Sequence, residues 1–416
     1  MPLPESTLAV PPHAVPSGRK SSWPEPEPLM PLAKYDAGWR RVVRNFTPSW
    51  FSVIMGTGIV GVLLHNMPYG AHELYYPSIV FFALNALLFG LALGISILRY
   101  TLYPECWGVM VRDPVNSLFL GTVPMGLATL IQMWTLVCVP AWGPWAVTFV
   151  WGVWIIDAVV AVAVAVMLPF LLMSTNYIKS LERITAVQLL PVAAMVVAGG
   201  VGARVAEVLP HPQRAFGTLV ASYILWGMGL PLALVILVIY YQRLAVHKLP
   251  PREAIASCCL PLGPLGFGGF GILYLGKVAQ KVFPLVGAVD PMAGQFAYLF
   301  GFFLSLIMWA FGLVWLFFAL ATVLQSGRFP FNMGWWGFVF PLGVYAASTV
   351  LLGQEFPSRF FRVLGMIFNC CVILLWFVVA AGTVKGVWTG KLFHAPCLAN
   401  LKPKPLDEED VLSKEA

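Results

Sequence analysis

A small set of side chains could act on a solute inside the long apolar stretches of this chain. Two cations, Arg204 and Lys277, lie late in the fifth and seventh stretches, and Asp157 is the carboxylate placed deepest in any of them. Hydroxyl groups without charge come from three further residues: Thr57, Thr122 and Ser348. Fixed positive charge raises the local concentration of anions, and hydroxyl groups donate hydrogen bonds without holding an ion too tightly to release it. The set therefore favours an anion pathway.

Sequence motifs of the common enzyme classes are missing. The chain has no His–Glu metal motif, no GxSxG and no Walker loop, and its seven cysteines lack metal-ligand spacing. The glycines of segment 266–271 imitate a phosphate-binding loop, but a dinucleotide fingerprint belongs to a strand–turn–helix unit and this segment is apolar throughout. We predict that the chain is not an enzyme and uses no cofactor and no metal.

The composition excludes most water-soluble classes. Hydrophobic residues make up 59% of the 416 residues and charged residues only 10%, whereas soluble domains are about 45–50% apolar and about 25% charged. The net charge of +7 is spread between apolar stretches, which is typical of orientation signals in a membrane protein and not of nucleic-acid binding. An all-α, multi-pass membrane protein is predicted, with the lipid bilayer as its solvent.

Ten stretches are long and apolar enough to cross the bilayer as helices, because about 20 apolar residues span its hydrocarbon core. They cover residues 49–66, 76–99, 117–138, 145–173, 184–207, 216–242, 256–281, 293–324, 333–353 and 360–384. The predicted organisation is a proline-rich, disordered cytosolic N-terminal tail (1–44), a ten-helix transmembrane transporter domain (45–390) and a cytosolic C-terminal tail (391–416).

The distribution of Lys and Arg predicts the orientation. Ten spans place both termini on one side of the membrane, and that side then holds 19 of the 25 basic residues. The other side holds Arg204, Arg214, Lys277, Lys281, Arg359 and Arg362. Cytoplasmic loops carry an excess of Lys and Arg, so both termini are predicted to be cytosolic.

The odd-numbered spans differ in composition from the even-numbered ones. They hold 18 glycines against 11. Four of them contain proline, at Pro124, Pro191, Pro264 and Pro341 among other positions. Proline bends a helix and frees backbone groups, while glycine allows close approach, and both are tolerated at membrane depth where protein or a wet cavity surrounds them. We predict five helical hairpins, with an inner ring of odd helices around a central pore lined by these kinks. The alternative is ordinary helix packing through small residues.

Each charged candidate also has a structural interpretation. Lys and Arg near helix ends commonly extend to the membrane interface, and Arg204 could pair with Glu207 three residues later. Asp157 lies on an even, outer helix, where it either couples proton movement or makes a hydrogen-bonded contact between helices.

The hairpin pattern and one segment of the ninth span resemble the tellurite-resistance/dicarboxylate transporter family, which includes the plant slow anion channels. Segment 331–341, FNMGWWGFVFP, is similar to that family's ninth-helix signature of an Asn, a Trp pair and Phe-Pro. The resemblance covers about residues 44–390. It implies a quasi-fivefold bundle of ten helices, a pore within each subunit, a homotrimer, and Phe340 as the aromatic gate of the pore.

Two further stretches resemble the fungal sulfite efflux pump branch of this family. They are NFTPSWF (45–51) with MGTGI (55–59) and LHNMPY (64–69), and DPVNS (113–117) with LGTVPMG (120–126). The malate-transporter branch is similar in the first stretch, so only the second separates the two. The resemblance implies export of sulfite or bisulfite across the plasma membrane. The alternatives are a malate or other C4-dicarboxylate carrier, a passive anion channel, and a non-transporting receptor or scaffold.

Overall fold

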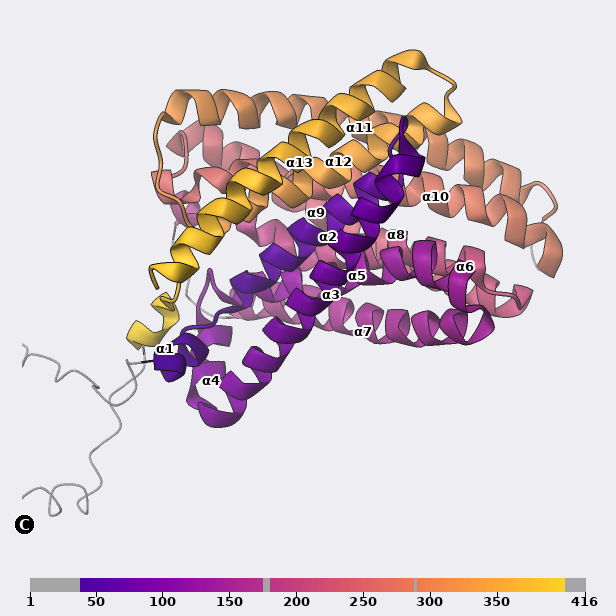
Figure 1. The fold of residues 1–416 in the computed structure, drawn as a ribbon. Helices are drawn as coiled ribbons and strands as arrows, with labels where there is room; N and C mark the ends of the chain where they lie inside the picture. The colour runs from indigo at the N-terminus through magenta and orange to yellow at the C-terminus, as the bar shows by residue number, and fades with distance from the viewer. Residues whose placement is uncertain (1–37, 175–179, 288–289, 401–416) are drawn as a thin grey trace, which may run out of the picture. The chain divides into compact units, whose positions relative to one another are not determined.

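The computed structural model describes residues 38–174, 180–287 and 290–400, and every regular element among them is helical. The chain divides into one unit that ends at Arg41 and a second that begins at Val42. Helix α1 (Gly38–Arg44) includes this division. All later elements belong to the second unit (Figure 1).

Ten helical spans of the described chain are long and apolar enough to cross a membrane, which confirms the predicted number and approximate bounds. The odd-numbered spans contain α2 (Phe51–His65), α5 (Thr122–Met133), α8 (Leu189–Val208), α10 (Leu262–Val286) and α12 (Trp336–Glu355). The even-numbered spans contain α3 (Ala71–Leu102), α7 (Pro144–Ser174), α9 (Pro212–His247), α11 (Ala293–Ser326) and α13 (Arg359–Trp388). The third span continues past α5 through a π-helical turn (Trp134–Cys138) into α6 (Val139–Trp142).

The two sets of spans differ in burial. In the most apolar window of each odd-numbered span, between 61% and 100% of the residues are buried, against 17% to 39% for the even-numbered spans. We therefore call the first set the inner helices and the second the outer helices. Outer helices expose large apolar side chains such as Val159, Phe303 and Leu374, which is the surface that hydrocarbon requires. The glycine-rich composition of the odd spans thus corresponds to helices enclosed by protein.

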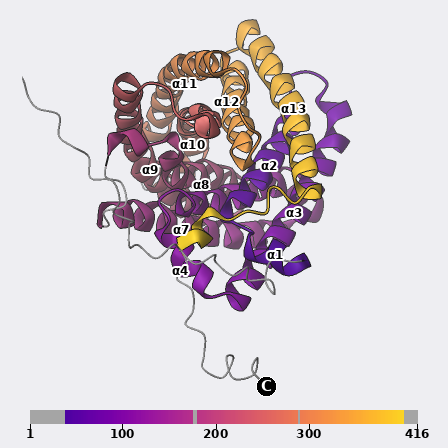
Figure 2. The same ribbon diagram turned by 90° about the vertical axis from the view of Figure 1, so that its left-hand side faces the viewer.

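Each inner helix packs against the outer helix that follows it in the chain, and the inner helices also contact one another. The contacts between inner helices run from α2 to α5, α8, α10 and α12 and return to α2. Figure 2 views the helices closer to end-on and shows α11 and α13 outside α12. Close contacts among the inner helices require small residues, because a Cβ on Gly266 of α10 would lie 2.7 Å from the Cα of Tyr345 on α12.

Every inner helix begins with a 3-10 turn. These turns are Pro48–Trp50, Ser117–Gly121, Ala186–Gln188, Arg252–Cys259 and Met333–Trp335. Pro124, Pro191 and Pro264 are each the third residue of the α-helix that follows, where a backbone N–H has no intrahelical partner and proline costs little. These three prolines therefore mark the start of an α-helix and differ from the kinks we predicted. Pro341 lies deeper, as the sixth residue of α12.

The predicted tails differ from the structure at their inner ends. Residues 1–37 and 401–416 lie outside the described part of the chain. Within it, Gly38–Arg44 form α1, and the first residues of the predicted C-terminal tail are packed rather than free. Ala395 and Cys397 are buried in a cluster with Met110, which belongs to α4 (Glu105–Arg112).

We expect Gly121→Ala to destabilise the protein. A Cβ at Gly121, which precedes α5, would lie 2.5 Å from the carbonyl oxygen of Leu190 on α8, and overpacking of this kind costs about 1–3 kcal/mol. The measurement is the thermal unfolding midpoint of the purified protein in detergent. Gly263→Ala is the matched control, because a Cβ at this buried inner-helix position meets nothing within 4 Å. Equal midpoints for the two variants would contradict the close approach of α5 and α8.

Candidate functional site

The inner helices enclose a cavity near each of their two ends. The larger one, here called the wide cavity, has a volume of about 160 Å³. Residues at the starts of all five inner helices line it, including Ser52, Phe119, Leu190, Ser257 and Gly334. Helix N-termini carry roughly half a positive charge each and present free N–H groups. Five of them surround this cavity and favour an anion there, although the lining also includes the acidic residue Glu253.

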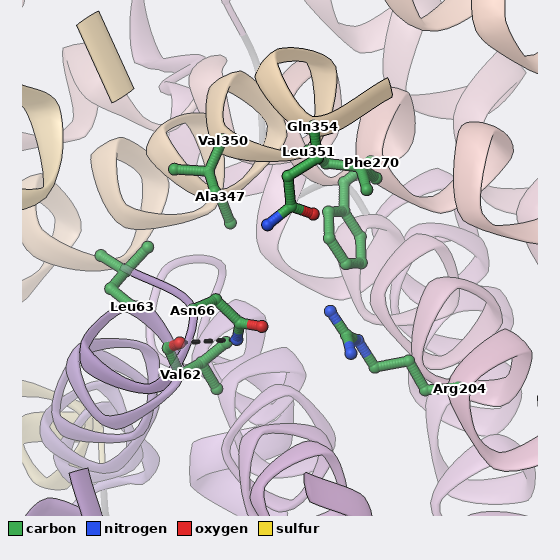
Figure 3. Close-up of a pocket in the computed structure, with 9 residues that line it drawn as sticks. All are labelled: Val62, Leu63, Asn66, Arg204, Phe270, Ala347, Val350, Leu351 and Gln354. Carbon is green, nitrogen blue, oxygen red and sulfur yellow. Dashed lines mark hydrogen bonds between the residues drawn. The ribbon is translucent and has the colours of Figure 1, made fainter. Parts of the chain in front are cut away.

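The smaller cavity, here called the arginine cavity, lies near the C-terminal ends of α2, α8 and α12 and beside Phe270 in the first half of α10. Its volume of about 20 Å³ is close to that of a single water molecule. Figure 3 shows the Arg204 guanidinium and the amide groups of Asn66 and Gln354 directed toward one space, beside the ring of Phe270. The Asn66 amide nitrogen already donates to the Val62 carbonyl at 2.8 Å, so the Arg204 guanidinium is the charged group that suits a small anion here.

Arg204 has no acidic partner among the residues that the structure describes. Its guanidinium carbon lies 4.5 Å from the ring centroid of Tyr274 and 5.3 Å from that of Phe270. Its Nε is buried and makes no hydrogen bond to any residue that the structure describes. The predicted alternative, an ion pair with Glu207, is therefore not found among the described residues. Aromatic faces stabilise a cation without neutralising it. Arg204 is thus free to attract an anion into the arginine cavity.

The second predicted cation, Lys277, is bound to a carboxylate. Its Nζ lies 2.6 Å from Oε1 of Glu355 on α12, and the other oxygen of Glu355 accepts a hydrogen bond from the Tyr298 hydroxyl at 2.8 Å. Lys277 does not line either cavity. The ion pair differs from the predicted role in the anion pathway, because the carboxylate already neutralises the ammonium group.

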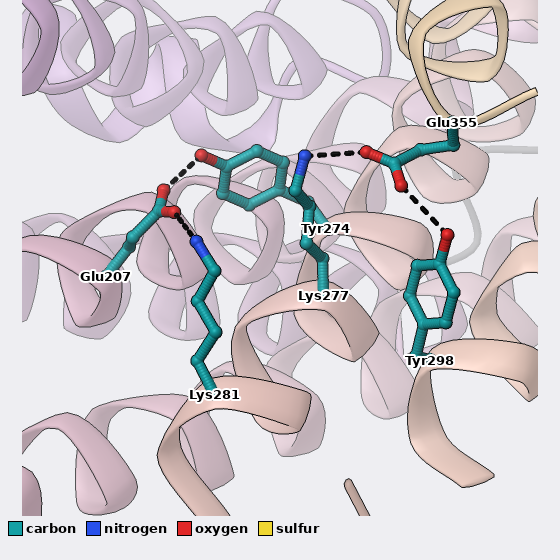
Figure 4. Close-up of polar contacts among 6 residues, drawn as sticks. All are labelled: Glu207, Tyr274, Lys277, Lys281, Tyr298 and Glu355. Carbon is teal, nitrogen blue, oxygen red and sulfur yellow. Dashed lines mark hydrogen bonds and ion pairs between the residues drawn. The ribbon is translucent and has the colours of Figure 1, made fainter. Parts of the chain in front are cut away.

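A matching arrangement surrounds Glu207. Lys281 Nζ lies 2.8 Å from its Oε1, and the Tyr274 hydroxyl donates to its Oε2. Figure 4 shows these contacts beside those of Glu355. We call the six residues Glu207, Tyr274, Lys277, Lys281, Tyr298 and Glu355 the rim network. Each carboxylate in it is held by one Lys and one Tyr, so the network has no net charge, and Arg204 is the cation that lines the adjacent arginine cavity.

The predicted hydroxyl donors are mostly engaged within and between helices. The Thr57 hydroxyl donates to the carbonyl of Val53 at 2.8 Å and accepts from the Trp376 indole at 3.1 Å. The Thr122 hydroxyl donates to the carbonyl of Phe119 at 2.6 Å. Only the buried Ser348 hydroxyl has no partner among the described residues. The lining of the two cavities includes none of the three and none of the four predicted prolines.

Phe340 is buried, with 4% of its surface exposed, on the inner helix α12. It follows Gly337, which lines the wide cavity, by three residues and precedes Ala347, which lines the arginine cavity, by seven. Three and seven residues return close to the same face of an α-helix. Phe340 itself lines neither cavity, but its position on α12 lies between residues that do.

Asp157 is completely buried on the outer helix α7, and neither carboxylate oxygen has a hydrogen-bond partner among the described residues. It belongs to the buried stripe of α7 that also contains Trp154 and Ala161. Asp157 lines neither cavity. The hydrogen-bonded contact between helices is therefore not found among the described residues, and the proton-coupling role stays a prediction.

Sequence reasoning missed several residues of this site. Asn66, Phe270 and Gln354 line the arginine cavity, and Glu355 binds Lys277. Glu355 could have been found from the sequence, because an acidic residue at the end of an odd-numbered span is as unusual as a cation such as Lys277. The sequence does not distinguish Asn66, Phe270 and Gln354, because the same residue types are common at membrane interfaces and in helix packing.

Comparison with known proteins gives the chain a family context. A model of the voltage-dependent anion channel family matches residues 45–384. The chain is 50% identical over 352 residues to a sulfite efflux pump of Arthroderma benhamiae, covering 85% of this chain and 93% of that protein. It is 25% identical to the sulfite efflux pump of Saccharomyces cerevisiae, covering 89% and 94% of the two chains. It is 22% identical to a malic acid transport protein of Schizosaccharomyces pombe, covering 94% and 88%.

We expect the two ion pairs of the rim network to differ in their contribution to stability. Lys277→Met leaves the Glu355 carboxylate, whose side chain is 13% exposed, without its cation, and such a loss costs about 1–3 kcal/mol. Lys281→Met is the control, because its pair is 57% and 29% exposed and exposed pairs contribute about 0–1 kcal/mol. Thermal unfolding midpoints measure both, and Lys277→Met/Glu355→Gln should recover most of the loss. A larger effect of Lys281→Met would refute this ranking.

Proposed function

Because the chain belongs to the voltage-dependent anion channel family, we propose that it exports sulfite or bisulfite across the plasma membrane through a pore inside each subunit. The observation that carries this proposal is the pair of cavities near opposite ends of the inner helices, one of them lined by Arg204, which has no acidic partner among the described residues. The 50% identity to a sulfite efflux pump supports the choice of substrate. The pathway needs no cofactor.

In the proposed pathway the anion enters the wide cavity, passes Phe340 and leaves through the arginine cavity. Moving a bare charge into hydrocarbon is prohibitive, so each stage must replace part of the ion's hydration. Five helix N-termini do this at the wide cavity. Arg204, Asn66 and Gln354 do it at the arginine cavity. Because these contacts are few and mostly neutral, the ion is bound weakly enough to leave.

Phe340 is proposed as the gate. Its ring is buried among the inner helices, and an apolar constriction excludes the water that an ion needs. A change of side-chain rotamer would move the ring out of the pathway without moving α12. The Ser348 hydroxyl, which is unpartnered on the same helix, is proposed as a hydrogen-bond donor to the anion beyond the gate.

The charge of the site favours a small anion over a C4-dicarboxylate. A dicarboxylate has two charges held apart, and the arginine cavity offers one guanidinium. Lys277, which could have supplied a second cation, is neutralised by Glu355. The lower identity to the malic acid transport protein, 22%, agrees with this preference. Malate transport is therefore the second candidate, and a passive anion channel of the same fold is the third.

The orientation and assembly are part of the proposal. The excess of Lys and Arg on the side of both termini supports a multi-pass protein with cytosolic termini. The wide cavity, at the starts of the odd-numbered spans, would then face the cytosol and receive the exported anion. A homotrimer is proposed from the family resemblance, with one independent pore in each subunit.

We expect Phe340→Ala to raise anion flux severalfold, because the smaller side chain lets water and ions through the constriction. The measurement is sulfite flux or anion current in proteoliposomes of the purified variant. Phe338→Ala is the matched control: Phe338 is also buried on α12, but it packs in a separate cluster with Phe329 and Trp335. Unchanged flux in a folded Phe340→Ala variant, or an equal rise in Phe338→Ala, would remove Phe340 from the mechanism.

A panel of anions tests the substrate. Proteoliposomes containing the wild-type protein should transport sulfite faster than malate, chloride or nitrate at equal concentration. Repeating the measurement with an imposed proton gradient separates a coupled pump from a passive channel. If a proton gradient accelerates transport and Asp157 carries the proton, Asp157→Asn should abolish the acceleration. A preference for malate over sulfite would overturn the proposed substrate.

A further inference from the structure

The lack of an ion pair at Arg204 among the described residues is unexpected from its position in the helix. Glu207 follows it by three residues on α8, so the two side chains are neighbours on one helical surface. An ion pair between them would neutralise the guanidinium that faces the arginine cavity. No such pair exists in the described part of the chain, and the bonding of Glu207 explains why.

Both carboxylate oxygens of Glu207 are bound to residues of α10. Oε1 accepts a hydrogen bond from Lys281 Nζ at 2.8 Å, and Oε2 accepts one from the Tyr274 hydroxyl. Figure 4 shows the carboxylate between these two donors. The same Tyr274 ring lies 4.5 Å from the guanidinium carbon of Arg204. Tyr274 therefore contacts both members of the ion pair that does not form.

We propose that Tyr274 is a positioning residue for anion binding. Its hydroxyl holds the Glu207 carboxylate away from Arg204, and its ring supports the guanidinium without neutralising it. This inference rests on the proposed function, in which Arg204 contacts the anion. Lys281 alone is a weak restraint on Glu207, since its side chain is 57% exposed and water screens such a pair. Without the Tyr274 hydroxyl, one oxygen of Glu207 is released beside Arg204 and competes with the anion.

The rim network contains a matched control for this role. Tyr298 donates its hydroxyl to Oε2 of Glu355 at 2.8 Å, and Lys277 binds the other oxygen at 2.6 Å. The chemical arrangement is the same as at Glu207. No arginine stacks on the Tyr298 ring among the described residues. Removing the hydroxyl of Tyr298 therefore perturbs a carboxylate of the rim without releasing it onto Arg204.

The test measures initial rates of radiolabelled sulfite uptake by proteoliposomes over a range of sulfite concentrations. Tyr274→Phe keeps the ring and removes the hydroxyl, and monodispersity in detergent checks its fold. We expect KM to rise about five-fold with little change in kcat, because a competing, partly exposed ion pair is worth up to about 1 kcal/mol. Tyr298→Phe should leave KM unchanged.

The second variant separates positioning from a merely structural effect. Tyr274→Phe/Glu207→Gln removes the competing charge and should return KM close to the wild-type value. An unchanged KM in Tyr274→Phe, or a double variant no better than Tyr274→Phe, would overturn the role of Tyr274. Arg204→Ala distinguishes the two proposals: if it raises KM while Tyr274→Phe does not, only the positioning role is wrong. If Arg204→Ala leaves KM unchanged, the binding site itself is wrong and the positioning role falls with it.

Discussion

Five outer helices keep lipid away from five inner helices, and the rest of the structure depends on this separation. A helix in contact with hydrocarbon must be apolar on its surface and regular in its backbone, because nothing else can satisfy its polar groups. The inner helices are released from both demands. They begin with 3-10 turns, carry proline near their starts and approach one another through glycine, as Gly266 does at Tyr345. Cavities lie near both ends of these helices.

The direction of the inner helices organises the electrostatics. All five run the same way, because each is followed by an outer helix that returns across the membrane. Their N-termini consequently gather at the wide cavity, where the dipoles add. Their C-terminal ends would repel anions, and Arg204 offsets this at the arginine cavity. The carboxylates of Glu207 and Glu355 lie close by, yet each is bound by a Lys and a Tyr. Among the described residues that line the arginine cavity, Arg204 is the one cation.

Prediction from the sequence was accurate where it depended on a property of the residue itself, such as its hydropathy or its small size. Long apolar runs identified all ten spans, and the glycine content separated the buried spans from the exposed ones. It was less accurate where a side chain has several possible partners. Lys277 was expected to face the pathway and is bound to Glu355, while the Thr57 hydroxyl is used between helices. These partners come from helices far apart in the chain, so no local pattern could reveal them. Phe340 was singled out only through the family resemblance, since one buried Phe looks like another.

The sequence alone determined that this chain is a multi-pass helical membrane protein with two kinds of span, because hydropathy and small-residue content act locally along the chain. Only the tertiary structure decided which charges are neutralised. Arg204 and Lys277 are the same kind of residue at similar positions in their spans, yet one faces a cavity beside aromatic rings and the other binds a carboxylate. The reason is that the strength of a charge inside a protein depends on its neighbours in space and on its distance from water. Neither the spatial neighbours of a charge nor its distance from water can be read from the sequence.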